Sequence, residues 1–429
     1  MPNMPKHAPA VLKTSRRGFL GSLGGVAVSG VSRALFPSWM PRLAFRQNGA
    51  PGDVLVAVFL RGGMDALNAV IPYGEGGAYY DQRPTIAIPA PDGSDQTALD
   101  LNGFFGLHPA LRPLKDVYDA GSLAVIHAVG SPDPTRSHFD AMEYMERGTP
   151  GMKVSQGGWL NRHLQTAVWE NDSPFRAVGM GAMLPTSLHG AVSALALQSI
   201  TDFHLGGRWD QAEAARRTLT SLYRTDAPPD LLAQTARDTF SMIDFLATLN
   251  AADYTPANGA AYAEDEFGMG LKQIAQLIKA GVGLEVACLD YGGWDTHESQ
   301  GGVEGWFAGN LRAFGQSLAA FYADLGDLMA NVTVVTMSEF GRRVEENASR
   351  GTDHGHGGCM FLMGGGVNGG VHTDWKGLAS DQLDEGDVQI TTDYRDVLAE
   401  ILTKRILNTA IDQIFPNYSP TLRGILKPR

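Results

Sequence analysis

Two short stretches late in the chain concentrate side chains that bind metals or transfer protons. Glu339 follows the β-branched run that begins at Val332, and Asp353, His354 and His356 come soon afterwards among glycines. Burying imidazoles and carboxylates together is costly unless they are paired or bind a cation. Three kinds of site would use them: a metal centre, a site for phosphate or sulfate ester chemistry, or a structural polar network.

Further polar clusters follow other apolar runs of strand length. These clusters contain Asp65, then Asp133, Arg136, Ser137 and His138, then Asp290, Asp295 and His297. In an open α/β sheet, sites form at the edge where the parallel strands have their carboxyl ends. We therefore expect these clusters to converge with Glu339 and with residues 353–356, although they are far apart in the sequence.

The residue types of these clusters indicate a divalent cation. Imidazole and carboxylate groups together suit Zn, Mn and similar ions, and carboxylate-rich sites also admit Mg or Ca. Two cations about 4 Å apart would stabilise both the attacking and the leaving oxygen of a phosphoryl transfer. The sequence leaves the identity and the number of ions open.

The apolar runs predict the strands that position these clusters. They span residues 53–60, 122–129, 284–289, 332–336 and 359–363. Segments with helical character alternate with them, at 111–118, 139–147, 266–280, 311–331 and 393–405. This alternation predicts an α/β domain with a mainly parallel central sheet and helices on both faces. Residues from about 208 to 280 read as several helices and predict a helical insertion or lobe.

The N-terminal segment has the features of an export signal. Thr14-Ser-Arg-Arg-Gly-Phe-Leu20 matches the twin-arginine consensus and is followed by a Gly-rich, weakly apolar run over residues 21–31. That run is too short to cross a bilayer as an ordinary transmembrane helix. Residues 1–50 are therefore predicted to be signal and linker, and residues 51–429 the folded domain. We expect export by the twin-arginine machinery to the periplasm, cell envelope or medium, with no transmembrane domain in the mature chain.

The composition narrows the function classes further. The formal net charge is −12, and the segment before Asp53 carries basic residues but no acid, so the remaining chain is more acidic still. A nucleic-acid partner is therefore not expected, because phosphate backbones bind to basic faces. The only two cysteines, Cys288 and Cys359, lie in apolar strand-like runs, which favours buried free thiols over a disulfide.

Six motifs in combination resemble the bacterial exported family called domain of unknown function 1501. They are Arg16-Arg-Gly-Phe-Leu20, Phe59-Leu-Arg-Gly-Gly-Met-Asp65, Arg136-Ser-His-Phe-Asp140, Gly293-Trp-Asp-Thr-His297, Ser338-Glu-Phe-Gly-Arg342 and Gly351-Thr-Asp-His-Gly355. That family is similar to the alkaline phosphatase and sulfatase superfamily. The resemblance implies an alkaline phosphatase-like sheet and an exported metal-dependent hydrolase of phosphate or sulfate esters, acting on a small molecule or a polysaccharide.

The resemblance also implies metal-binding roles for particular residues. These are Asp65, Asp295, His297, Glu339, Asp353, His354 and His356. Asp65 matches the first-strand ligand of the superfamily, while Asp295 and His297 resemble a ligand pair with shorter spacing. Phe340 stands where the superfamily has a histidine ligand. An imidazole from His138, His354 or His356 must therefore make up the difference.

The catalytic candidates are Ser137, Arg136 and His138. Sulfatases carry Cys/Ser-x-Pro-x-Arg, and residues 134–136 resemble the tail of that motif, but Pro132 occupies the nucleophile's position. Ser137 is the first candidate because backbone N–H groups at a helix N-terminus favour a bound anion, with Ser131 and Thr135 as weaker candidates. Ser137 is equally expected to be a helix cap, and Arg136 is expected either to hold an ester oxygen or to pair with a surface acid.

Two other functions remain open on the sequence alone. A catalytically degenerate member of the family would bind a ligand, polysaccharide or partner in the envelope without turnover. A structural protein of the envelope would use the polar cluster as a buried network. The missing histidine at Phe340 and the absence of a clear nucleophile motivate both alternatives.

Overall fold

The computed structural model describes residues 53–153, 157–169, 171, 173–201 and 253–429, together with 214, 217–218, 242–246 and 249. The predicted twin-arginine segment lies outside these residues. So does about half of the predicted helical insertion, of which the C-terminal helix α9 is described. No helix in the described part of the chain is long and apolar enough to cross a membrane.

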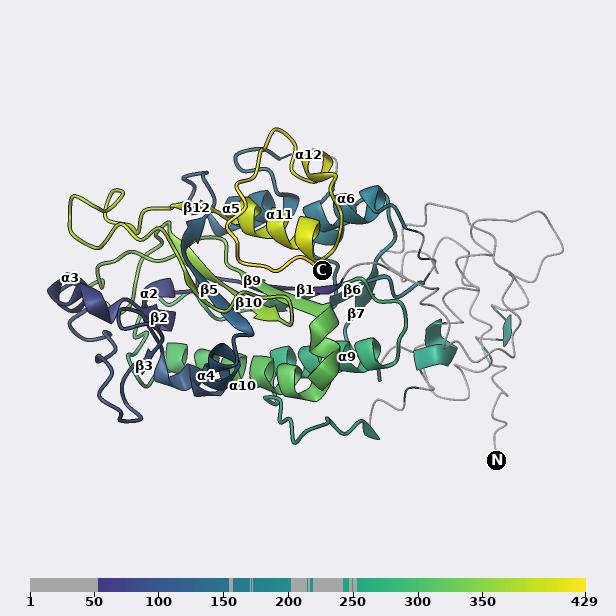
Figure 1. Ribbon diagram of the computed structural model, residues 1–429, viewed down its shortest axis with the longest axis horizontal. Coiled ribbons are helices and arrows are strands. Elements are labelled where there is room, and N and C mark those ends of the chain that lie inside the picture. The colour runs from purple at the N-terminus through teal and green to yellow at the C-terminus, as the bar shows by residue number, and fades with distance from the viewer. Residues whose placement is uncertain are drawn as a thin grey trace, which may run out of the picture.

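A nine-stranded sheet in the order β11-β5-β10-β9-β1-β8-β6-β7 forms the centre of the fold, with β12 paired to β5 (Figure 1). Its strands are β1 Val54–Leu60, β5 Leu123–Gly130, β6 Ala177–Met180, β7 Leu195–Leu197, β8 Val286–Tyr291, β9 Val332–Met337, β10 Gly358–Gly364, β11 Gly370–His372 and β12 Thr392–Asp393. All adjacent pairs are parallel except those of β10, which runs antiparallel to both β5 and β9. The predicted mainly parallel α/β sheet is therefore confirmed.

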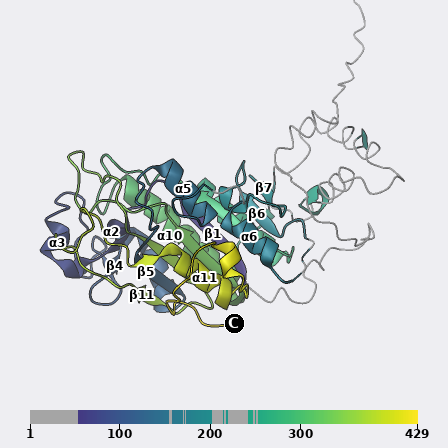
Figure 2. The same ribbon diagram turned by 90° about the horizontal axis from the view of Figure 1, so that it is seen from above.

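Helices cover both faces of this sheet. The main ones are α4 Arg112–Asp119, α5 His138–Arg147, α6 Trp159–Thr166, α9 Glu266–Lys279, α10 Trp306–Leu325, α11 Tyr394–Lys404 and α12 Ile411–Ile414. Figure 1 shows α4, α9 and α10 below the sheet and α5, α6, α11 and α12 above it. In the view from above, α11 crosses over α10, with the sheet between them (Figure 2).

The strands are apolar on both sides because each face packs against a helical layer. In β1, Val56 and Val58 belong to the core on the side of α10, while Leu55 and Phe59 belong to the core on the side of α11. The other central strands alternate in the same way. This two-sided burial explains why continuous apolar runs in the sequence predicted the strands correctly.

Two local features differ from the sequence prediction. The helix predicted over 311–331 is divided into α10 and a 3₁₀ helix, η5 Gly326–Asn331, because Gly326 takes a positive φ of 51° at the end of α10. A small second sheet, β2 Val70–Ile71, β4 Gly106–Leu107 and β3 Leu99–Asp100, lies between the first two predicted strands, where the apolar runs predict no strand.

The remaining short elements surround these layers. They are α2 Ala66–Ala69, α3 Gly77–Tyr80, η1 Tyr73–Glu75, η2 Pro109–Leu111 and η3 Thr186–Leu188. Cys288 on β8 and Cys359 on β10 are free and buried, so the prediction of buried thiols is confirmed.

Three buried histidines are held by their surroundings in the neutral form. Burial lowers the pKa of His108 to about 4, that of His127 to about 4 and that of His163 to about 3. In each ring Nδ1 accepts a hydrogen bond, from the backbone N–H of Ala110, the backbone N–H of Ala128 and the side-chain amide of Asn408, respectively. An accepting nitrogen carries no proton, so the folded protein disfavours the imidazolium.

We predict that the protein loses stability as the pH falls below 6.5. The three histidines then bind protons in the unfolded chain but not in the folded one, so each subtracts up to about 1.4 kcal/mol per pH unit until its folded pKa is reached. Urea unfolding between pH 7.5 and 5 measures this slope. His163→Phe should make the slope shallower, since Asn408 retains its bonds to the His163 carbonyl and Thr166. A stability that does not change over this range would contradict the prediction.

Candidate metal centre

Loops from five strands meet at one edge of the sheet. The parallel strands β1, β5, β8 and β9 end there, and each is followed by one of the predicted polar clusters. Since β10 runs in the opposite direction, it begins at this edge, and the loop that precedes it, residues 351–357, arrives there as well. The reversed strand thus brings His354 beside side chains that follow strands of the other direction.

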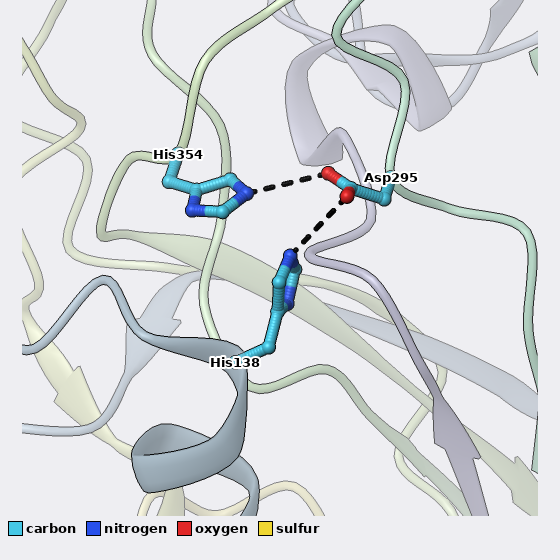
Figure 3. A group of neighbouring side chains, drawn as sticks. All are labelled: His138, Asp295 and His354. Carbon is cyan, nitrogen blue, oxygen red and sulfur yellow. Dashed lines mark hydrogen bonds and ion pairs between the residues drawn. The ribbon is translucent and has the colours of Figure 1, made fainter.

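Asp295 stands at the centre of the resulting cluster. Its Oδ2 lies 3.5 Å from Nε2 of His138, and its Oδ1 lies 3.3 Å from Nε2 of His354 (Figure 3). One potential ligand atom from each of the three residues lies within 4.8 Å of the other two. His138 begins α5, Asp295 follows β8 and His354 precedes β10, so three separate elements supply this group.

The two imidazole rings are oriented by acceptors on their other nitrogen. His138 donates from Nδ1 to Oε1 of Glu339 at 2.7 Å, and His354 donates from Nδ1 to the carbonyl oxygen of Arg136 at 2.9 Å. Because a carboxylate and a carbonyl only accept hydrogen bonds, the neutral rings present the Nε2 lone pair toward Asp295. Such an acceptor behind a histidine ring is the usual partner of a metal-binding imidazole.

His297 extends the cluster with a third imidazole. Its Nδ1 donates to Oδ1 of Asp353 at 3.0 Å, while its Nε2 lies 3.1 Å from Oδ1 of Asp295 and 2.9 Å from Nε2 of His354. Two nitrogen lone pairs at that separation repel each other unless a proton or a cation lies between them. His297 therefore faces the same point as the other two histidines.

The Nε2 atom of His138 gives a direct test of whether these residues fit a metal ion. That atom is buried and has no hydrogen-bond partner, and Oδ2 of Asp295, which is also an acceptor, lies 3.5 Å from it. A buried unsatisfied nitrogen is unfavourable, whereas a cation between the two groups would satisfy both. Imidazole nitrogen together with carboxylate oxygen is a donor set that suits Zn²⁺ and similar ions.

Glu339 is a buried orienting residue of this cluster. Its Oε1 also accepts from the backbone N–H of Gly62 at 2.8 Å, and its Oε2 accepts from the Ser338 hydroxyl at 3.2 Å. Gly62 also lets the loop after β8 approach closely, because a Cβ atom there would lie 2.6 Å from the backbone nitrogen of Asp295. The carboxylate of Glu339 thus lies behind the His138 ring.

Phe340 forms an aromatic wall beside the histidines. The centroid of its ring is 4.9 Å from that of His138 and 4.8 Å from that of His354. Gly63, with φ of 63°, leaves room for this ring, since a Cβ atom would lie 2.6 Å from it. Phe340 therefore contributes packing at this point of the site.

Arg342 is the main residue of the site to which the sequence analysis assigned no role. Its buried guanidinium donates to Oδ1 of Asp295 at 2.6 Å and to the carbonyl oxygens of Gly63 at 2.6 Å and Thr352 at 2.7 Å. The Ser338-Glu-Phe-Gly-Arg342 motif contains it, but nothing in the sequence indicates that it is buried. Its position fixes one oxygen of Asp295 and leaves the other free.

The electrostatic environment differs among the three central residues. The hydrogen bond to Glu339 raises the pKa of His138, whereas burial lowers the pKa of His354. Burial opposes the ionisation of Asp295, but the hydrogen bond and charge of Arg342 outweigh it and lower the pKa of that carboxyl. Asp295 is therefore ionised at neutral pH.

The structure does not bring the predicted ligand Asp65 to the cluster. Its carboxylate is fully buried and accepts from Nη1 of Arg83 at 2.6 Å and from Nε2 of Gln300 at 2.6 Å. Its other oxygen caps α2 through the N–H of Leu67 at 3.2 Å. These partners neutralise Asp65 and hold it in a structural ion pair.

The predicted ligand His356 also faces a different way. Its Nε2 donates to the carbonyl oxygen of Asp133 at 3.2 Å, and its Nδ1 lies 3.8 Å from Asp384. Residues 354 and 356 of an extended loop have different neighbours here, and only His354 joins the central group. Asp353 and Glu339 lie behind rings as orienting partners, as described above.

The catalytic candidates occupy three different environments. His138 lies in the cluster, and Ser137 is the N-cap residue of α5 but makes no side-chain capping bond. Arg136 pairs through Nη2 with the buried Asp387 at 2.5 Å, while its backbone carbonyl holds His354. Arg136 thus pairs with an acid, but with a buried one and not with the expected surface acid.

Comparison with known proteins identifies a family and a set of distant structures. A profile of the family described as "Protein of unknown function (DUF1501)" matches residues 120–410. No protein of curated function matches the chain.

Several solved structures are distantly similar to this chain. The PsFucS1 sulfatase from Pseudoalteromonas sp. is 12% identical, with a TM-score of 0.34, over 82% of this chain and 67% of that chain. The C-terminal periplasmic domain of EcEptC from Escherichia coli is 11% identical, with a TM-score of 0.34, over 89% and 92%. A mutant TAB5 alkaline phosphatase with Mg bound is 7% identical, with a TM-score of 0.30, over 73% and 90%. These scores are too low to assign a function.

We predict that a substitution in the metal-binding group changes zinc affinity, whereas a substitution in the buried ion pair changes stability. His354→Ala should weaken zinc binding by more than the roughly 100-fold typical of losing an orienting partner. Asp65→Asn should leave zinc affinity unchanged but lower the free energy of unfolding by about 3–5 kcal/mol, because it leaves Arg83 charged and buried without its partner. Zinc titration with a chelating indicator and urea unfolding measure the two effects. Loss of zinc binding in Asp65→Asn would contradict the assignment.

Proposed function

The chain belongs to the family described as Protein of unknown function (DUF1501), and we propose that it is an exported, metal-dependent hydrolase of phosphate or sulfate esters. The observation that carries this proposal is the aim of the His138 and His354 Nε2 atoms at the carboxylate of Asp295. Each ring is held in that orientation by an acceptor on its other nitrogen. His138, His354 and Asp295 would hold the ion, with His297 beside them. When bound, a divalent ion there supplies Lewis-acid chemistry for an ester oxygen.

The exposure of the cluster supports access by a substrate. The side chains of Asp295, His297 and Asp353 are 46%, 41% and 60% exposed, respectively. His138 and His354 are less exposed, at 23% and 21%, because Phe340 packs against both rings. A substrate would therefore approach on the side of Asp295 and His297, with Phe340 excluding water on the other side.

Two arginines near the cluster are candidates to bind the ester's anionic oxygens. Arg136 and Arg343 are each about one-third exposed, and both contact the buried Asp387. Nη2 of Arg136 lies 2.5 Å from Oδ2 of Asp387, and Nε of Arg343 lies 3.9 Å from its Oδ1. The backbone of Arg136 is tied to His354, so its guanidinium is anchored next to the proposed centre. Guanidinium groups bind phosphate-like oxygens through paired, charge-assisted hydrogen bonds.

Ser137 remains the candidate nucleophile within this proposal. It directly precedes His138 at the N-terminus of α5, a helix of 10 residues, and its side chain makes no capping bond. The first N–H groups and the dipole of such a helix favour a negative charge nearby. A water molecule activated at the centre is the other candidate.

A non-catalytic envelope protein that binds a ligand is the second candidate function. It is favoured by Phe340, which replaces an imidazole with an apolar ring, and by Asp65, whose charge is neutralised by Arg83. Both features reduce the number of ligands that the superfamily site would have. Binding without turnover would then be the expected behaviour.

Hydrolysis of nitrophenyl phosphate and nitrophenyl sulfate tests the proposed activity. We expect zinc-loaded or manganese-loaded protein to release nitrophenol and His354→Ala to lose at least about 100-fold in kcat/KM, since it removes a metal ligand. Asp65→Asn serves as the control that lies outside the cluster. Ser137→Ala distinguishes a serine nucleophile from an activated water molecule. Activity is lost in this variant only if the Ser137 hydroxyl is the nucleophile. Metal-loaded protein that cleaves neither ester would favour the binding function.

Export is the second testable part of the proposal. The twin-arginine motif at residues 14–20 supports transport of the folded chain to the periplasm or beyond. Replacing both Arg16 and Arg17 by lysine should retain the full chain inside the cell, as measured by cell fractionation, while Lys13→Ala should not. Unchanged export of the double variant would contradict this part.

A further inference from the structure

The oxygens around the cluster allow the number of metal ions to be counted. A centre with two ions needs two sets of ligand atoms that are free of other partners, usually with carboxylates that contribute to both. The histidines and Asp295 provide one set. A second ion would need its ligands from the other carboxylates at this edge of the sheet.

Three of these carboxylates already have partners on the atoms that would be needed. Asp65 is bonded to Arg83 and Gln300, and both oxygens of Asp290 accept from Nη2 of Arg61 at 2.9 Å and 3.0 Å. Glu339 accepts three bonds, from the backbone N–H of Gly62, from His138 and from Ser338.

Asp353 lies on the wrong side of its histidine to act as a ligand. Its Oδ1 accepts from Nδ1 of His297 at 3.0 Å and from the amide of Asn347 at 3.0 Å. The ligand nitrogen of His297, Nε2, points in the other direction, toward Asp295. Asp353 is therefore an orienting partner of His297, as Glu339 is of His138.

Arg342 limits Asp295 itself to one ion. Its Nη2 lies 2.6 Å from Oδ1 of Asp295 and 2.5 Å from the carbonyl oxygen of Gly62, and its other nitrogens bond Gly63 and Thr352. A guanidinium stays protonated at any ordinary pH, and it cannot leave without orphaning these buried carbonyl groups. A second cation on Oδ1 would have to displace it.

We propose that the cluster is built for a single borderline metal ion of the zinc type, and that the fixed charge of Arg342 takes the place of a second ion. His138, His354 and Oδ2 of Asp295 are its ligands, and His297 is the fourth candidate. Three imidazoles with one free carboxylate oxygen favour zinc over Mg²⁺ or Ca²⁺, which prefer several oxygens. The inference rests on the metal-binding part of the proposed function.

Metal stoichiometry tests this inference without an activity assay. The full chain, stripped with a chelator and dialysed against micromolar zinc, is expected to retain one zinc per chain by elemental analysis, and excess Mg²⁺ or Ca²⁺ should not displace it. Two zinc ions per chain, or displacement by Mg²⁺ or Ca²⁺, would overturn it. Asp295→Asn should lose the zinc, whereas His189→Ala, which removes an exposed histidine bonded to a carbonyl oxygen of its own loop, should retain it.

Glu339→Gln separates an orienting partner from a ligand. The amide still accepts the bond from His138, so we expect one zinc per chain with an affinity weaker by about 10–100-fold. A wild type with two zinc ions whose count falls to one in this variant would make Glu339 a ligand and refute the proposal. One zinc without ester hydrolysis would instead refute the proposed activity, and hydrolysis with two zinc ions would refute only the inference of a single ion.

Discussion

The buried guanidinium of Arg342 links the loops at the edge of the sheet where the candidate metal centre lies. Arg342 follows β9, yet it bonds backbone carbonyls in the loop after β1 and in the loop before β10, together with the carboxylate that follows β8. A planar group with five fixed donors suits such convergence better than a lysine, which is a point charge on a flexible stem. The relative positions of three loops, those after β1 and β8 and the one that joins β9 to β10, therefore depend on one side chain, and that side chain contacts Asp295 directly.

The second constraint is the reversed direction of β10. If β10 ran parallel to its neighbours, its carboxyl end would face this edge and the loop at 351–357 would lie at the opposite end of the sheet. Antiparallel pairing with β5 and β9 instead places His354 next to His138 and Asp295. Rigid strands fix the loop ends, and acceptors behind each ring fix the imidazoles, so the donor set is preorganised before any ion arrives.

The sequence predicted the strands and much of the cluster because both depend on local patterns. Continuous apolar runs mark strands covered on two faces, and polar residues directly after them mark the site edge; the family expected from the motifs is also confirmed. The ion pair of Asp65 with Arg83, the burial of Arg342 and the direction of β10 depend on contacts between distant segments. For that reason Asp65 resembled a ligand in the sequence although its charge is neutralised in the fold, and His356 resembled His354 although the two rings face different loops.

The contacts between acceptors at the centre explain why a cation rather than a structural polar network fits this group best. A buried network becomes stable when each donor meets an acceptor. Around Asp295 the neutral forms of His138, His297 and His354 all direct acceptor lone pairs inward, since the N–H of each ring points outward to Glu339, Asp353 or Arg136. Only Arg342 donates to the centre, and it satisfies one oxygen of Asp295. Protonating His138, whose pKa is raised by its bond to Glu339, would let its Nε2 donate to Oδ2 of Asp295, but Nε2 of His297 and Nε2 of His354 would still face each other as acceptors at 2.9 Å. A positive ion satisfies all of these groups at once, which a single added proton does not.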